Sequence, residues 1–332
     1  MRGDRSLGQS PVFALSLLTV AMGLIPLNDA LFKLLSDHLS LGQLIAIRAI
    51  VTLALLGVFT RTIGAMLALS AAVFWQFFGR AACLIVAMTL FFISLGTLPL
   101  ANVIAIFFVA PMIITLLSVP LLGETIGRHR VAAVSAGMIG VLLIVQPGSA
   151  AFQPESLLVF LAALSYAAFQ IWTRRLKDTG DLGAMVAVQH LSFLLAGTVM
   201  LAGNWWWPVP TTGNASVDFL FRAPAAFGLM ELVYLVFCAM IVLFLSFASS
   251  HAYRTVEASA IAPFEYVAIP SSVVWGVLIW NDGPNALALA GMGLILAGGL
   301  YRLFREKRRA VDAVTTAAAT FPRRRTTKLW FA

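Results

Sequence analysis

Long apolar runs follow one another along the chain, separated by short polar segments. Each run has about 20 residues, the length that a helix needs to cross the hydrocarbon core of a bilayer. In lipid the backbone N–H and C=O groups must be satisfied within the segment, so runs of this length predict helices rather than barrel strands. The ten predicted spans are residues 11–32, 41–60, 79–97, 100–122, 130–147, 154–173, 182–202, 228–251, 257–280 and 285–304. The pattern therefore predicts an all-α polytopic membrane protein with ten transmembrane helices.

The second half of the chain repeats the layout of the first half. Residues 11–147 hold five apolar runs, and residues 153–304 hold five more in matching order. Within these halves Arg130–Ile144 aligns with Pro284–Gly298, and both stretches contain the tripeptide Ala-Gly-Met. Because five is an odd number, the second copy enters the membrane from the opposite side to the first. The layout predicts two inverted five-helix repeats, which are typical of carriers that open to each side in turn.

Three segments outside the ten runs have their own predictions. Residues 61–78 are rather apolar and aromatic, and they either lie flat at the membrane interface or lengthen the third helix inward. The longest outer loop, 203–227, begins with Trp205–Trp207, which is typical of an interfacial anchor; a substrate lid is the alternative. The tail 305–332 is basic and low in complexity. We expect this tail to be disordered in the cytoplasm, close to anionic lipid.

The composition supports the membrane class. Apolar residues make up 61% of the chain and charged residues only 11%, whereas a soluble domain has about 25% charged residues. The net charge of +8 would also suit a nucleic-acid-binding protein. The basic residues, however, gather at span ends and in the tail, where a membrane protein needs them, and form no stripe with aromatic residues. We therefore expect the lipid bilayer, and no nucleic acid, as a partner of this chain.

Lysine and arginine also predict the orientation. With the N-terminus inside, the inner segments and span ends hold 15 of these residues, Arg80 among them, whereas the outer segments hold only Lys33 and Arg222. Cytoplasmic segments carry the excess of lysine and arginine in membrane proteins. Both termini are therefore predicted to be cytoplasmic, in a multi-pass protein of the inner (plasma) membrane.

Short motifs in both halves resemble those of a known family. They read Pro99-Leu100-Ala101-Asn102, Ala110-Pro111 and Leu122-Gly123-Glu124 in the first half, and Ala262-Pro263-Phe264-Glu265-Tyr266 and Gly298-Gly299-Leu300-Tyr301 in the second. In order and spacing they resemble the EamA-type repeat of the drug/metabolite transporter superfamily, over about residues 11–305. The resemblance implies ten helices in two inverted repeats, and movement of small organic solutes such as amino acids, nucleoside-like compounds or vitamins. One departure is Asp282, which keeps a carboxylate where the family has Gly-Glu.

Ionisable residues inside the apolar runs are the candidates for function. A charge at the centre of a membrane helix costs about 2.5–3.5 kcal/mol on insertion scales, so it faces a cavity or a partner. Glu265 is the sharpest candidate, roughly 12 Å into the ninth run by helix rise and close to Pro263 and Pro270. Prolines free backbone carbonyls, which can line a cavity. A carboxylate in that setting suits proton coupling or the binding of an amine.

Arg48 and Asp29 enter the membrane from the same outer side. Arg48 lies roughly 10 Å into the second run, and Asp29 is its best partner in the sequence. A carboxylate or phosphate on a substrate would suit Arg48 equally well. Asp29 also stands four residues before Lys33, which is the favourable order for a helical ion pair. Substrate contact and structural pairing therefore both stay open for these side chains.

Four further residues complete the candidate site. His190 lies roughly 12 Å into the seventh run, where it either relays protons or, as a neutral side chain, bonds a neighbouring helix. Asn102 and Gln170 are polar residues of the fourth and sixth runs, and each either lines a cavity or serves helix packing. Tyr266 follows Glu265 and is predicted to take part in the same substrate-binding or coupling site.

Motifs of catalysis are missing from the sequence. We find no HExxH, GxSxG, GxxxxGK[ST] or CxxC pattern, and the four histidines are scattered through different segments. The sequence therefore predicts no enzyme, no metal site and no cofactor. It predicts a secondary transporter that moves a small organic metabolite by alternating access, as a monomer or a homodimer, with protons as the coupling ion that Glu265 would serve. The alternative is a membrane-embedded enzyme or lipid-handling protein, which would need clustered metal ligands or a nucleophile at a span end.

Overall fold

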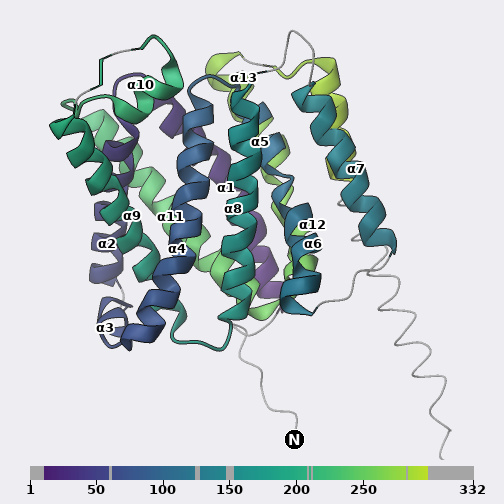
Figure 1. Cartoon of the computed structure of the whole chain (residues 1–332), viewed down its shortest axis with the longest axis horizontal. Coiled ribbons are helices and arrows are strands. Elements are labelled where there is room, and N and C mark those ends of the chain that lie inside the picture. Colours follow the sequence, from purple (N-terminus) through teal and green to yellow (C-terminus); the bar gives the residue numbers. More distant parts are fainter. Residues whose placement is uncertain are drawn as a thin grey trace, which may run out of the picture.

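Helices account for all the regular structure of the described chain (Figure 1). The computed structural model describes residues 11–59, 62–123, 128–146, 153–207, 209–210, 212–281 and 283–297. Within these ranges no strand occurs, so the predicted all-helical class is confirmed. The tail 305–332 and the side chains of Glu124 and Asp282 lie outside the described residues, and the predictions made for them stay predictions.

Seven spans of the described chain are long and apolar enough to cross a membrane. They are α1 (Pro11–Leu35), α2 (Leu41–Phe59), α4 (Ala71–Leu95), the broken pair α5 (Leu100–Phe107) and α6 (Ala110–Leu122), α8 (Glu155–Arg175), α9 (Leu182–Trp206) and α11 (Leu229–Thr255). The shorter helices are α7 (Arg128–Val145), α12 (Ala258–Glu265), α13 (Ala268–Trp280) and a C-terminal helix over Ala286–Ala297. Of these, α13, the C-terminal helix and the Ser135–Val145 part of α7 are apolar. The chain is thus a multi-pass membrane protein, as predicted.

The third long helix begins earlier than the sequence predicts. A start at residue 79 was expected, but α4 begins at Ala71, where the Ser70 side chain accepts the N–H of Val73. The aromatic segment of residues 61–78 divides into the short helix α3 (Thr62–Leu67) and the first turns of α4. Of the two predicted alternatives, the lengthened helix is therefore the correct one for the aromatic residues after Ser70.

Two helices are broken near the middle of the bundle. α5 and α6 are separated at Phe108 and Val109, directly before Pro111. α12 and α13 are separated at Tyr266 and Val267, shortly before Pro270. Proline has no N–H to donate, so it is tolerated in the first turn of a new helix and ends the regular bonding of the preceding one. Each break therefore leaves backbone carbonyl groups inside the bundle without the N–H partner that a regular helix would give them.

The helices pack in a definite order (Figure 1). α1 lies along α11, α4 along α8, and α2 along α9. The broken pair α12–α13 packs against α1, and the broken pair α5–α6 packs against α8. Short helices mark the two ends of the bundle: α3 lies at one end, which we call the α3 face, and α10 (Ala215–Phe221) lies at the other, the α10 face.

Glycines allow the closest crossings. On α9, a Cβ added to Gly197 would lie 2.6 Å from the backbone nitrogen of Ala46 on α2. On α7, a Cβ added to Gly140 would lie 2.6 Å from the carbonyl oxygen of Gly291 in the C-terminal helix. Side chains larger than hydrogen would have to push these backbones apart, so α2–α9 and α7–C-terminal helix contacts are of the small-residue type common in membranes.

The outer loop predicted over 203–227 contains α10 and an ordered turn. The carboxylate of Asp218 accepts the backbone N–H groups of Thr212, at 2.7 Å, and Gly213, at 3.3 Å. The Thr212 N–H holds the pKa of Asp218 below its usual range, and the nearby Arg222 acts in the same direction. The three tryptophans at the end of α9 have side chains that are 72–79% exposed. Both the anchor and the lid require such exposure, so the choice between them stays open.

Candidate functional site

A cavity lies among the helices, bordered by both broken pairs. Its volume is about 120 Å³, whereas a single water needs about 10–15 Å³. Phenylalanines and aliphatic side chains form most of the wall. The polar side chains of the wall are Asn28, Asp29, Arg48, Tyr166, Gln189, Ser246, Ser249, Ser250 and Glu265. A mostly apolar wall with a few polar groups is typical of a small-molecule site.

Arg48 enters this cavity from α2. Its side chain is 5% exposed, and its Nη1 donates to Oδ1 of Asn28 on α1 at 3.4 Å. The guanidinium carbon lies 4.4 Å from the ring centre of Phe32 and 5.8 Å from that of Phe193. Aromatic faces attract a cation electrostatically, and more strongly where water is excluded. Arg48 is thus held as a cation in the cavity wall by one amide oxygen and a cage of rings.

Asp29 reaches Arg48 through Asn28 rather than directly. The amide nitrogen of Asn28 donates to Oδ1 of Asp29 at 2.9 Å, while the amide oxygen of the same residue accepts from Arg48. Pro26 lies inside α1 just before this pair, so the helix lacks one of its regular hydrogen bonds there. The predicted partnership of Asp29 with Arg48 therefore takes a bridged form, and the residue that forms the bridge was not recognised in the sequence.

Lys33 makes contacts outside the cluster of Asn28, Asp29 and Arg48. Its Nζ donates to the carbonyl oxygen of Leu98 at 2.7 Å and lies 5.3 Å from the ring centre of Trp280. The side chain ties the end of α1 to the segment before α5 and to the end of α13.

Glu265 enters the cavity from the break between α12 and α13. It is the last residue of α12 and is only 1% exposed. Oε1 accepts the hydroxyl of Tyr253 on α11 at 3.1 Å and the hydroxyl of Tyr166 on α8 at 3.4 Å. Both bonds use the same oxygen, and within the described residues Oε2 has no hydrogen-bond partner. The carboxylate therefore has one oxygen held by two helices and a second oxygen free to bind in the cavity.

Gln170 bonds Tyr166, one of the two tyrosines that donate to Glu265. Its Nε2 donates to the Tyr166 hydroxyl and, at 3.1 Å, to Ser249 on α11. Its Oε1 is buried and has no partner among the described residues. Ser249, Tyr166 and Glu265 line the cavity, whereas Gln170 does not. The structure thus places this predicted residue next to Glu265 in a supporting position.

The remaining predicted residues lie off the cavity wall. The ring nitrogen Nε2 of His190 lies 3.1 Å from the Ser246 hydroxyl of α11, so this histidine is bonded to a neighbouring helix. Tyr266 is buried, with its ring 5.8 Å from that of Phe108, so the two helix breaks touch each other here. Asn102 has a buried Oδ1 without a partner in the described chain.

Arg80 was placed wrongly by the sequence. It was counted among the charges at an inner span end, but it is 0% exposed, inside α4. Its Nε donates to Thr173 at 2.6 Å, Nη1 to Gln189 at 3.1 Å and Nη2 to Ser250 at 3.0 Å. These bonds join α4 to α8, α9 and α11. The early start of α4 is the reason for the error, because it carries this arginine about two and a half turns into the bundle.

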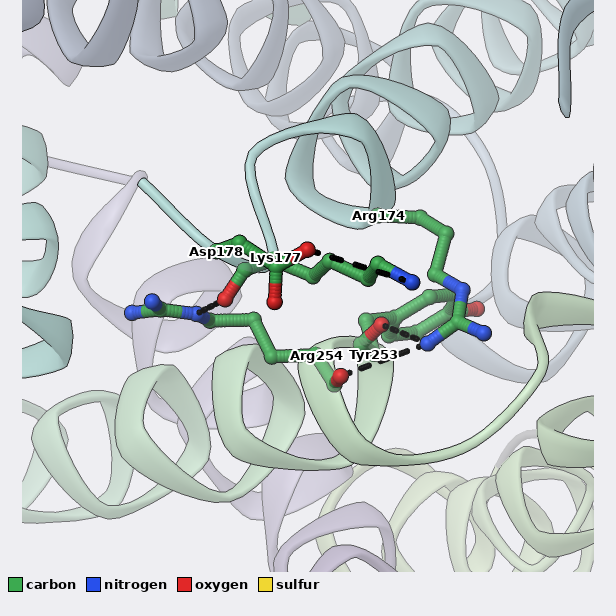
Figure 2. A network of polar contacts seen from close by, with 5 residues as sticks. All are labelled: Arg174, Lys177, Asp178, Tyr253 and Arg254. Atoms are coloured by element: carbon green, nitrogen blue, oxygen red, sulfur yellow. Dashed lines mark hydrogen bonds and ion pairs between the residues drawn. The ribbon is translucent and has the colours of Figure 1, made fainter. Parts of the chain in front are cut away.

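Arginines also hold the helix ends at the α3 face, as Figure 2 shows. Arg174 at the end of α8 donates to the carbonyl oxygens of Tyr253, at 3.5 Å, and Arg254, at 3.3 Å, at the end of α11. In return Arg254 donates to the carbonyl oxygen of Lys177 at 2.8 Å, in the turn after α8. Carbonyl groups at a helix C-terminus lack intrahelical partners and carry partial negative charge. The two ends therefore cap each other and join α8 to α11 at Tyr253 and Arg254.

Metal-binding groups are not assembled in the described chain. Among those residues, no three side chains of His, Cys, Asp or Glu lie together in a way that could hold a metal ion. The groups that lie on or beside the cavity wall are two buried arginines, two buried carboxylates and a set of aromatic faces.

The bridge at Asn28 gives a prediction for stability. Replacing it with leucine, which is close in size, leaves Arg48 and Asp29 without their shared amide, and a buried charged group that loses its bond costs about 2–3 kcal/mol. We expect Asn28→Leu to lower the free energy of unfolding by about that amount in a denaturant titration of the purified protein. Asn102→Leu is the control, because the buried amide oxygen of Asn102 makes no bond in the described chain. Equal effects of both changes would contradict the bridge.

Known proteins resemble this chain in sequence. Residues 9–146 match the EamA-like transporter family. An S-adenosylmethionine uptake transporter of Rickettsia prowazekii is 24% identical, over 69% of this chain and 71% of its own length. A riboflavin transporter of Rhizobium johnstonii is 26% identical, over 71% and 72%. The pseudopaline exporter CntI of Pseudomonas aeruginosa is 26% identical, over 66% and 70%.

The fold is also found in solved structures. One crystal structure covers 90% of this chain and 98% of its own, with a TM-score of 0.61 and 16% sequence identity. Identity at that level shows a shared fold and nothing of function. The match of residues 9–146 to the EamA-like transporter family confirms the resemblance that the motifs predicted, in a chain whose apolar helices make it a multi-pass membrane protein.

Proposed function

We propose that the chain is a secondary transporter that moves a small organic metabolite across the inner membrane by alternating access. The observation that carries the proposal is Glu265: a buried carboxylate at a helix break, on the wall of a cavity, with one oxygen available to a ligand or a proton. Ionisable groups inside a membrane are costly and mark substrate or ion pathways. The names of the relatives, which include uptake transporters and an exporter, support transport without deciding its direction.

The architecture that we propose is ten spans in two inverted repeats, over 11–147 and 153–304. Three features support it. Both halves contain one broken helix in the fourth position, α5–α6 and α12–α13. The contacts are reciprocal: the first helix of one half lies along the third helix of the other, as α1 on α11 and α4 on α8. Each broken pair also packs on the first helix of the opposite half. Each half therefore makes equivalent contacts on the other, an arrangement that suits two halves that rock about a central site.

The coupling step that we propose uses the proton. With Glu265 ionised, Tyr166 and Tyr253 donate to its Oε1, and this ties α8 and α11 to the break of α12–α13. Protonation neutralises the carboxylate and weakens these charge-assisted bonds. The end of α11 that carries Tyr253 is the one that Arg174 and Arg254 hold at the α3 face. A change in the charge of Glu265 would in this way alter the contacts that hold the ends of α8 and α11 together at the α3 face.

A substitution tests the coupling role. Glu265→Gln has the size of the parent side chain and the charge of its protonated form. In liposomes that contain the protein, labelled S-adenosylmethionine and riboflavin are the first cargoes to assay. We expect the variant to fold and to exchange cargo across the membrane, but to lose accumulation driven by a proton gradient.

The outcomes of this test separate two roles. Loss of exchange together with weaker cargo binding would mean that Glu265 holds an amine of the cargo and does not carry the coupling proton. Asp178→Asn is the control, since the Asp178 side chain is 88% exposed at the α3 face. A Glu265→Gln protein that accumulates cargo like the parent, with the same pH dependence, would remove Glu265 from both roles.

A second test concerns orientation. The excess of lysine and arginine predicts that both termini are cytoplasmic and that the α3 face is the inner one. Alkaline phosphatase is active only outside the cytoplasm, so a fusion after Arg309 should be inactive and a fusion within 210–220 active. Reversed activities would contradict the orientation, and with it the inverted arrangement of the repeats.

A further inference from the structure

Arg80 is a buried cation whose partners are all neutral. The three oxygens that it contacts belong to Thr173, Gln189 and Ser250, and its guanidinium carbon lies 4.1 Å from the ring centre of Phe169. In the described part of the chain no carboxylate lies within ion-pair distance of it. A charge inside the membrane is expensive, and pairing or a water-filled cavity is what makes it tolerable. Helix packing alone would not require a full positive charge at this position.

Arg48 and Arg80 differ in the charge of the side chains around them. Asn28 links Arg48 to Asp29, so that arginine has an acidic side chain in its own cluster. Arg80 has no such link. Its contacts are hydroxyl and amide oxygens, whose bonds to a cation are weaker than those of an ionised acceptor. Of the two arginines near the cavity, Arg80 is the one with an unbalanced charge.

The guanidinium of Arg80 lies directly behind the cavity wall. Phe169, Gln189 and Ser250 line the cavity, and all three contact Arg80. Gln189 is a flexible side chain with a second bond, from its Nε2 to Ser246 at 3.1 Å. Because Nη1 donates to Gln189 and Nη2 to Ser250, release of both contacts would leave the two nitrogens beside the cavity wall. These are the two nitrogens that bind a carboxylate in the bidentate manner.

From this geometry we propose that Arg80 is a binding site for a carboxylate group of the transported molecule, on the α3 side of the cavity. The carboxylate replaces the neutral contacts to Gln189 and Ser250, since an ionised acceptor makes the stronger bond. The same exchange releases α4 from α9 and α11. The inference rests on the proposed transport function, and it assigns that function to cargo that carries an organic acid.

The test uses a pair of probes that differ in charge. Benzoate and its neutral analogue benzamide are small and aromatic, which suits a cavity lined by phenylalanines. Purified full-length protein is titrated with each at neutral pH in a buffer without other carboxylates, and binding is followed by thermal stabilisation. We expect benzoate to stabilise the protein and benzamide to do so much less. Arg80→Gln should weaken benzoate binding at least about tenfold, and Arg80→Lys should retain part of it.

A second pair of variants covers the case in which Arg80→Gln does not fold. Ser192 and Ser250 are both buried serines, but only Ser250 lines the cavity and bonds Arg80, whereas Ser192 bonds the backbone of its own helix. Ser250→Ala removes a competitor for the guanidinium, so benzoate should bind about two- to fivefold more tightly. Ser192→Ala should leave benzoate affinity unchanged. A structural role for Arg80 predicts no gain in either variant.

Several results would overturn the proposal. Benzoate binding that is unchanged in Arg80→Gln, or lost in Arg48→Gln alone, would move the site to another residue. Equal stabilisation by benzoate and benzamide would show that charge is not recognised. Stabilisation by chloride or inorganic phosphate but not by benzoate would mean a site for free inorganic ions. Because these measurements record binding, a failure of transport in liposomes with intact Arg80-dependent binding would overturn the proposed function and leave this site in place.

Discussion

The cost of a charge in the bilayer is the constraint on which the rest of this structure depends. Four ionisable side chains, Asp29, Arg48, Arg80 and Glu265, are at most 6% exposed among apolar helices. A charge in so apolar a setting is tolerable only with hydrogen bonds, an opposite charge or access to water. Three of the four lie on the wall of one cavity and the fourth lies directly behind it. Keeping these charges on and behind the wall of a cavity costs folding free energy, and a purely structural bundle would not need that cost.

Backbone breaks and side-chain bonds act together around these charges. The break after Glu265 and the break after Phe107 meet at the contact between Tyr266 and Phe108. Polar bonds cross from α4 in the first half to α8, α9 and α11 in the second, and others join α12 to α8 and α11 within the second half. Ionised groups form the stronger of these bonds, so we propose that a proton or an organic acid in the cavity would change how firmly the helices are joined. In that proposal, recognition and movement both depend on one hydrogen-bond network.

The sequence predicted the buried charged residues better than the hydrogen bonds that join them. Glu265, Arg48 and Asp29 stood out because a charge within an apolar run is costly, and this signal is local. Asn28 carries no charge and gave no such signal, although it joins two of those residues. Arg80 was misplaced because hydropathy locates a helix start only to within a few residues, and here the aromatic segment before it is helical. Bonds such as Arg80 to Ser250 link residues 170 positions apart, and no pattern in a single sequence encodes them.

Access to the cavity from both sides of the membrane is the central claim, and thiol labelling measures it. Cys83 and Cys238 are the only cysteines, so a cysteine-free protein needs two substitutions, and Leu245→Cys then places one thiol on the cavity wall. A membrane-impermeant methanethiosulfonate reagent is added to one side of oriented vesicles and then, separately, to the other. The account predicts labelling from each side, because the same wall opens in turn to both. Labelling from one side only would contradict alternating access through this cavity.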